Sequence, residues 1–273
     1  MSLRGLHHVT AITGDAPANL RFYTDTLGLR LVKKTVNFDA PDVYHLYYGD
    51  ESGTPGSLLT FFEFPHAARG RAGDGMIHRI VWRVASDEAL AFWQERVGGA
   101  VFSDPEGLEH ELVVAPGEQQ LVAPADDIPA ELAIGGLHAV RAFAREPQRG
   151  APLIAALGLE DAWYVQDPPP DAPGIQGAGT VHHVAWSAAD DAELTEYRAK
   201  AQQAGAHATG IIDRQYFHSV YFREPSGVLF ELASRDVGFT VDEPLETLGE
   251  ALMLPPQHEH LRAQLEQLLT PLT

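Results

Sequence analysis

The chain has 273 residues, of which 45% are hydrophobic and 21% charged, so its composition is that of a globular protein. Its formal charge of -19 excludes the basic face that nucleic-acid binding needs, and no apolar run reaches the ~20 residues of a membrane span, so we expect a cytoplasmic protein without nucleic-acid or membrane partners. The sequence contains no cysteine, so any metal must be bound by Asp, Glu or one of the 13 histidines.

Four short segments repeat one pattern, in which a histidine follows an aliphatic residue and a second aliphatic residue closes the motif. They are Leu6-His7-His8-Val9, Ile77-His78-Arg79-Ile80, Leu137-His138-Ala139-Val140 and Val181-His182-His183-Val184. A pattern that recurs in this way indicates duplication of one structural unit. The sequence therefore predicts four modules, each of which opens with a strand.

The first module shows the full order of elements. Its apolar spacing predicts a strand at 6–12, a helix at 17–27 and three strands at 30–38, 43–49 and 57–64. Gly28 follows the helix as a candidate C-cap. The module is therefore expected to be a βαβββ unit.

The later modules repeat this order with weaker signals. The predicted elements are a helix at 87–97 and strands at 112–115 and 119–122 in the second module, a helix at 152–157 in the third, and a helix at 192–203 in the fourth. We expect an α+β protein with an N-terminal half at 1–122 (modules 1 and 2), a linker at 123–135, a C-terminal half at 136–234 (modules 3 and 4) and an extension at 235–273.

The extension carries an apolar stripe that predicts a final helix. Its residues are Leu261, Leu265, Leu268 and Leu269. We interpret the stripe as packing against the rest of the chain, and a homodimer contact is the alternative.

The second position of each repeated motif separates the modules. It is occupied by His8, Arg79, Ala139 and His183, so the first and fourth modules alone offer a histidine there. The first position is a histidine in every module, and for His78 and His138 a structural role is the simpler interpretation. Because side chains alternate along a strand, equivalent positions face equivalent sides of their sheets.

A carboxylate completes a candidate metal centre. Glu231 lies four residues beyond Gly227 in a strand that looks buried, and the same count from Gly56 gives Thr60 in the first module. Two histidines and one carboxylate form the face that holds Fe(II) in oxygenases with open coordination positions. The outer modules are therefore expected to meet, with His8, His183 and Glu231 around one ion.

Several longer segments carry a family resemblance. They are Phe22-Tyr23 through Leu27-Gly28-Leu29, Pro225 to Glu231, Gly5 to Thr10, Tyr44 to Tyr48 with Gly53 to Gly56, and Asp213 to Pro225. The chain resembles the vicinal-oxygen-chelate superfamily of glyoxalases, bleomycin-resistance proteins and extradiol dioxygenases. Within it, the chain is most similar to ring-cleaving dioxygenases of the hydroquinone type. The resemblance implies modules paired into two curved mixed-sheet halves.

The resemblance also implies roles for individual residues. It places the metal on His8, His183 and Glu231, with Fe(II) as the cofactor and Mn(II) or another divalent ion as alternatives. Other catalytic residues fall on matching positions: His7, Thr10, His182, Arg214 and Tyr221. By strand alternation, however, His7 and His182 face away from the metal side, and a structural histidine is the competing interpretation.

The implied reaction cleaves a hydroquinone- or catechol-like ring with insertion of both atoms of O2. His182, His7 or Tyr221 would take the phenolic proton, and Arg214 would stabilise an anionic oxygen. Aromatic residues expected to line the ring pocket are Trp186, Tyr216, Phe217 and Phe222.

Two other functions remain open on the sequence. A glyoxalase-type isomerase would need a fourth protein ligand where Thr60 stands. A metal-free protein that binds small molecules such as drugs would keep two histidines and a glutamate in register only by coincidence.

Overall fold

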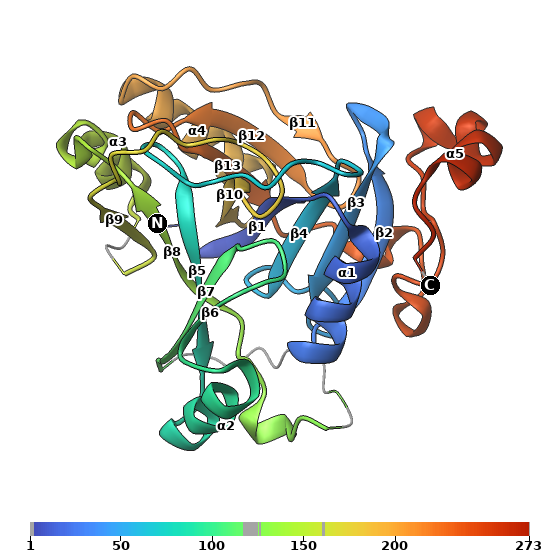
Figure 1. Ribbon diagram of the computed structural model, residues 1–273. Helices are drawn as coiled ribbons and strands as arrows, with labels where there is room; N and C mark the ends of the chain where they lie inside the picture. The colour runs from blue at the N-terminus through green and yellow to red at the C-terminus, as the bar shows by residue number, and fades with distance from the viewer. Residues whose placement is uncertain (1–2, 117–124, 126, 160–161, 273) are drawn as a thin grey trace.

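A computed structural model describes residues 3–116, 125, 127–159 and 162–272, which form two β-sheets with helices around them (Figure 1). The expected strand at 119–122 lies outside the described residues. No helix in the described part of the chain has the length and apolarity to cross a membrane. The structure confirms the expected fold class, an α+β protein.

The larger sheet has eight strands, contributed by the first and fourth modules. Its strand order is β11-β12-β13-β10-β1-β4-β3-β2, so the opening strands of the two modules lie side by side at its centre. The strands are β1 Leu6–Thr13, β2 Arg30–Asn37, β3 Ala40–Gly49, β4 Leu58–Glu63, β10 Val181–Ala188, β11 Ile212–Asp213, β12 His218–Arg223 and β13 Leu229–Ser234.

The smaller sheet has five strands, contributed by the second and third modules in the order β6-β7-β5-β8-β9. They are β5 Ile77–Val84, β6 Val101–Ser103, β7 Glu109–Val114, β8 Leu137–Phe143 and β9 Tyr164–Asp167. Modules therefore pair first with fourth and second with third, and each expected sequence half contributes to both sheets. The boundaries at 122, 135 and 234 stay predictions.

The helices begin and end close to the expected positions. They are α1 Ala16–Arg21, continued by a π-helical turn at Phe22–Thr26, then α2 Asp87–Val97, α3 Ala151–Leu157, α4 Asp191–Gln203 and α5 Arg262–Leu268. Short 3-10 segments lie at Ala130–Leu132, Pro147–Arg149, Phe239–Val241, Leu245–Thr247 and Pro256–Leu261. Ser86 and Asp190 cap α2 and α4 by accepting backbone N–H bonds, and Gly98 ends α2 with a φ of 84°.

The C-terminal extension lies alongside β2, the edge strand of the larger sheet (Figure 1). Leu265 and Leu269 are buried in the core, whereas Leu268 is 57% exposed. The leucine stripe thus packs largely against the chain itself, as we expected. The alternative homodimer stays a prediction.

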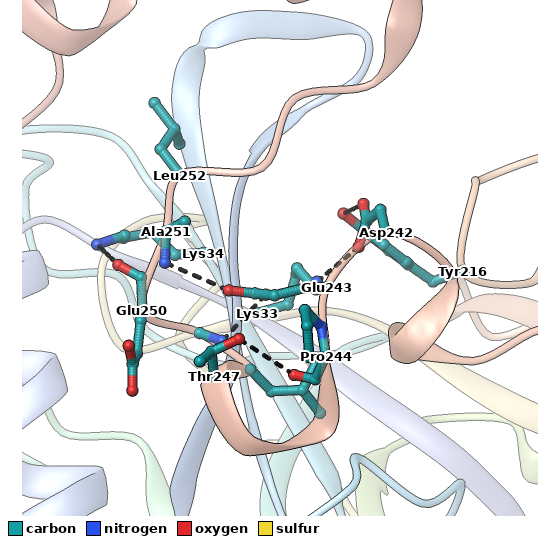
Figure 2. Close-up of polar contacts among 12 residues, drawn as sticks. Lys33, Lys34, Tyr216, Asp242, Glu243, Pro244, Thr247, Glu250, Ala251 and Leu252 are labelled. Carbon is teal, nitrogen blue, oxygen red and sulfur yellow. Dashed lines mark hydrogen bonds and ion pairs between the residues drawn. The ribbon is translucent and has the colours of Figure 1, made fainter.

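A buried ion cluster fixes this extension to the sheet (Figure 2). Lys33 on β2 is fully buried, and its Nζ donates to Asp242 Oδ1 and Glu243 Oε2, both at 2.7 Å. Glu243 also accepts the backbone N–H groups of Gly249 and Ala251. A buried lysine is costly unless it is paired, so the extension is held where its two carboxylates meet Lys33.

We expect Lys33→Met to lower the free energy of unfolding by about 3 kcal/mol, because it leaves the buried Glu243 carboxylate without its cation. Urea denaturation followed by circular dichroism measures the change. Lys34→Met is the matched control, because Lys34 Nζ donates to the backbone carbonyl of Glu250 at the exposed surface. This substitution should change the free energy of unfolding by no more than about 0.5 kcal/mol. Equal losses in the two variants would contradict this account.

Candidate metal centre

Three adjacent strands bring His8, His183 and Glu231 together. The His8 and His183 Nε2 atoms are 3.2 Å apart, and Glu231 Oε2 lies 3.3 Å from His8 Nε2 and 2.9 Å from His183 Nε2. All three residues are buried, and among the described residues they are the one group of His, Asp or Glu close enough to hold an ion. The outer modules thus place the candidate ligands as the sequence predicted.

Strand register explains why these side chains converge. His8 on β1 lies opposite Ala185 on β10, and Ala185 lies opposite Glu231 on β13. The three residues form one row across the sheet, and their side chains share a face. The small Ala185 leaves space between the larger neighbours. His183 lies two residues before Ala185 and faces the same side.

A chain of hydrogen bonds sets the tautomer of His8. The Ser234 carbonyl can only accept, so His7 must donate to it from Nε2, at 3.0 Å. Burial, followed by the neighbouring His8, lowers the pKa of His7 to about 3, so His7 is neutral and its Nδ1 accepts from His8 Nδ1–H, at 3.0 Å. His8 therefore presents the Nε2 lone pair to the site, as a metal ligand must.

His182 supports His183 in the same way. The two Nδ1 atoms are 2.8 Å apart. His182 is the exposed residue of β10, yet partial desolvation of its ring, followed by His183, lowers its pKa to about 4. Strand alternation predicted that His7 and His182 face away from the ligands. Instead, each places its Nδ1 within hydrogen-bond distance of the Nδ1 of the neighbouring ligand histidine. For His7 the reason is a register irregularity between Leu6 and His8 where β1 pairs with β10.

The donor set fits a divalent cation. Ser219 donates to Glu231 Oε1 at 2.5 Å, whereas Oε2 is buried and makes no hydrogen bond of acceptable geometry although both Nε2 atoms are near. Burial alone would raise the pKa of Glu231, but the two histidines outweigh it and hold the pKa well below its usual value. Two imidazole lone pairs and an ionised carboxylate oxygen that point to one place match a two-His, one-carboxylate site.

A cavity of about 280 Å³ opens onto these ligands. Its lining residues are His8, Asn37, Phe38, Asp39, His45, Tyr47, Phe62, His182, His183, Arg214, Phe217, Tyr221, Leu229 and Glu231. Arg214 Nε donates to the Tyr221 hydroxyl at 3.3 Å, and Arg214 Nη1 lies 3.0 Å from Asp39 Oδ2. Aromatic rings and a few directed polar groups are typical of a pocket for a small aromatic ligand.

Other expected site residues lie elsewhere. Thr10 is fully buried and does not line the cavity, and its hydroxyl bonds that of Thr60 at 2.8 Å. Of the aromatic residues expected to line the pocket, only Phe217 does so, with its ring centroid 5.1 Å from that of His8. Trp186 and Phe222 belong to the hydrophobic core, because their strand positions face away from the cavity.

Tyr216 was also expected to line the pocket but does not, and it supports a loop of the cavity instead. Its hydroxyl donates to Asp242 Oδ2 at 3.0 Å (Figure 2). Gln215 Nε2 donates to the same oxygen at 2.6 Å. Gln215 has a φ of 65°, which a non-glycine residue rarely adopts. The Lys33 cluster thus holds the loop between Arg214 and Phe217.

The sequence reasoning missed His45, Tyr47, Phe38, Asp39 and Phe62 as cavity residues. His45 and Tyr47 were visible within the Tyr44 to Tyr48 segment, where alternation puts them on one face of β3. That face could be recognised only once the register of β3 against β4 was known.

An ion pair fills the equivalent place in the smaller sheet. Val81 pairs with Glu111 there, as Ala185 pairs with Glu231 in the larger sheet, so Glu111 is the counterpart of Glu231. Arg79 replaces the ligand histidine, and Arg79 Nη1 lies 3.0 Å from Glu111 Oε2. A guanidinium thus supplies the positive charge.

The histidines of the inner modules have other surroundings. His78 Nε2 bonds Asp167 Oδ2 at 2.9 Å, and its ring stacks on Phe143. The structure places neither His78 nor His138 at the ligand cluster.

The fold and the candidate ligands define a protein that is built from paired βαβββ modules and has a site able to hold a divalent metal. The model of the Glyoxalase/Bleomycin resistance protein/Dioxygenase superfamily matches residues 5–232, and the chain belongs to this superfamily.

Relatives cover nearly the whole chain. The chain is 38% identical to the "Putative ring-cleaving dioxygenase MhqO" of Bacillus subtilis, over 98% of this chain and 96% of that protein. It is 33% identical to the chlorohydroquinone/hydroquinone 1,2-dioxygenase of Sphingobium indicum, over 96% and 95% of the two chains.

Solved structures agree with this assignment. The crystal structure of a "putative dioxygenase" from Bacillus subtilis matches with a TM-score of 0.93 and 38% identity, over 100% of this chain and 98% of that one. Glyoxalase I from Zea mays matches with a TM-score of 0.59 at 15% identity, over 90% and 97%, which shows a shared fold.

We expect His183→Ala to reduce bound metal from stoichiometric to trace amounts, because two protein ligands would remain. Metal analysis of anaerobically purified protein measures the content. His138→Ala, which removes a histidine from a module without ligands, should keep the full amount. Stoichiometric metal in His183→Ala would remove His183 from the ligand set.

We expect His7→Phe to weaken metal binding by about 10- to 100-fold, because it deletes the acceptor that fixes the His8 tautomer. His7→Gln should recover much of the affinity, since an amide can accept from His8 and donate to Ser234. Competition with a chromophoric chelator measures both. Equal affinity in His7→Phe and the unmodified protein would show that His7 has no such role.

Proposed function

We propose that this protein is an Fe(II)-dependent, extradiol-type dioxygenase that cleaves a hydroquinone- or catechol-like ring and inserts both atoms of O2. The observation that carries the proposal is the buried face of His8, His183 and Glu231, which opens onto a cavity of about 280 Å³. The names of two relatives support it, a ring-cleaving dioxygenase at 38% identity and a chlorohydroquinone/hydroquinone 1,2-dioxygenase at 33%. Mn(II) or another divalent ion is the alternative occupant.

Iron bound here would supply adjacent open positions for a substrate oxygen and for O2, and a route for electrons between them. The chain itself provides the binding surface. Phe38, Phe62 and Phe217 line the cavity and exclude water from the ring. Glu231 leaves the centre with a net positive charge, which favours a substrate oxygen bound as the anion.

The hydrogen-bond pattern gives His182 a donor role. If His183 binds the metal through Nε2, its Nδ1–H donates to His182 Nδ1, and the proton of the neutral His182 ring is then on Nε2. His182 lines the cavity, so Nε2–H can donate to an oxygen bound there. The alternative role as base for the phenolic proton would require a free lone pair, which this arrangement does not leave.

Tyr221 and Arg214 add further donors on another wall. Arg214 Nε donates to the Tyr221 oxygen, and both residues line the cavity. Burial raises the pKa of Tyr221 well above its usual value, so the phenol keeps its proton. Together these groups stabilise negative charge that develops on oxygen during the reaction.

A glyoxalase-type isomerase is less well supported. Thr60, where a fourth ligand would stand, bonds Thr10 and His45 through its hydroxyl. Glu63 accepts the backbone N–H of Ala16 at the start of α1. A metal-free binding role is disfavoured because it gives no reason for two buried histidines and a buried glutamate to converge on one point.

The test is ring cleavage by protein reconstituted with Fe(II) without oxygen and then exposed to 18O2 with hydroquinone or catechol. We expect a ring-opened product that contains two labelled atoms. Absence of cleavage with Fe(II), together with isomerisation of a hemithioacetal by the nickel or zinc form, would replace the proposal by the isomerase. Failure to bind any metal would favour the metal-free role.

A further inference from the structure

A second polar group faces the cavity from β3. Tyr47 pairs with Thr60 on β4, and Thr60 pairs with Thr10 on β1, so these residues form one row on the face that also carries His8. Strands lie about 4.8 Å apart, so β3 is about 10 Å from β1 at the backbone. Tyr47 and His45 therefore reach the cavity from the side opposite β10 and β13.

A hydrogen-bonded chain ends at Tyr47. Thr10 bonds Thr60 at 2.8 Å, Thr60 bonds His45 Nε2 at 2.9 Å, and His45 Nδ1 bonds the Tyr47 hydroxyl at 2.9 Å. His45 uses both ring nitrogens and Thr60 makes two bonds, whereas the hydroxyls at the two ends each make one bond within the chain. Thr10 does not line the cavity, whereas Tyr47 does. The Tyr47 hydroxyl is thus the member of the chain that is available to a ligand.

The side chains of Tyr47 and His45 are both neutral near physiological pH. Burial, followed by Tyr221, raises the pKa of Tyr47 well above its usual value, and burial, followed by His8, lowers that of His45 well below. The chain can run in either direction because every member both donates and accepts. Tyr47 can therefore meet a hydroxyl group as donor or acceptor, which suits an uncharged oxygen substituent.

We propose that Tyr47, positioned by His45, binds a second oxygen substituent of the aromatic substrate, on the ring carbon opposite the oxygen held at the metal centre. The inference rests on the proposed function. A single ring with oxygens on opposite carbons fits between side chains from β1 and β3. In a ring with oxygens on adjacent carbons, both oxygens lie beside the metal ligands, and the Tyr47 hydroxyl makes no hydrogen bond to the substrate. Tyr47 is thus a determinant of specificity for para-diols.

The test compares ligand binding to metal-loaded protein without O2, measured by calorimetry. The unmodified protein should bind hydroquinone about tenfold more tightly than 4-methylphenol, which replaces the second hydroxyl by a methyl group. Tyr47→Phe should lose this preference and bind 4-methylphenol as before. Catechol binding should also be unchanged in Tyr47→Phe.

Tyr48→Phe is the matched control. Tyr48 is the next residue on β3, faces the core and has a buried hydroxyl without a hydrogen bond, so its removal should leave the preference intact. His45→Phe tests the positioning role, because it should also reduce the preference. The double variant of His45 and Tyr47 should be no worse than Tyr47→Phe, since both act through one bond to the ligand.

The outcomes separate this inference from the proposed function. Ring cleavage by the unmodified protein, combined with an unchanged preference in Tyr47→Phe, overturns the role of Tyr47 and leaves the dioxygenase in place. An equal loss of preference in Tyr48→Phe overturns it as well. If the unmodified protein neither binds nor cleaves any of these rings, the proposed function fails and the inference fails with it.

Discussion

The burial of one ionised carboxylate constrains the whole structure. Glu231 is completely inaccessible, and a carboxylate in such a place is stable only beside compensating charge or hydrogen bonds. Its neighbours meet that demand, because Ser219 donates to one oxygen and two imidazoles face the other. Each imidazole is in turn oriented by a second histidine. The central strands of the larger sheet are therefore arranged around a place for positive charge.

The smaller sheet meets the same demand with a different cation. Arg79 lies where a ligand histidine would be and pairs with Glu111 and Glu109. The second and fourth modules thus share the acidic position and differ in what neutralises it. A guanidinium is permanently charged and brings its own hydrogen-bond donors, so this copy is complete without a ligand and serves the fold.

Sequence patterns predicted what depends on local order. The repeated His motif located the four opening strands. Apolar spacing predicted a helix at 87–97, and α2 spans the same residues. The second motif position selected His8 and His183, because it alone differs between modules. These inferences needed no knowledge of how the strands pair.

Features that depend on pairing were beyond the sequence. The candidate ligands predicted that the first and fourth modules meet, but not that β1 and β10 pair at the centre of one sheet. Nor did local patterns show that Lys33 meets carboxylates more than two hundred residues away along the chain. The contact of His7 with His8 depends on a register irregularity, which alternation cannot foresee. Trp186 and Phe222 were expected in the cavity because aromatic composition alone does not say which face of a strand is buried.

The pairing of the outer modules has a consequence for biosynthesis. Residues 8 and 183 are separated by 175 positions, and the carboxylate at 231 comes later still. On the ribosome, the inner sheet can close while the central edge of β1 still lacks its neighbour β10, and such an open edge invites pairing with other chains. All three candidate ligands are therefore present only after translation of the fourth module, and until then β1 has an unpaired edge.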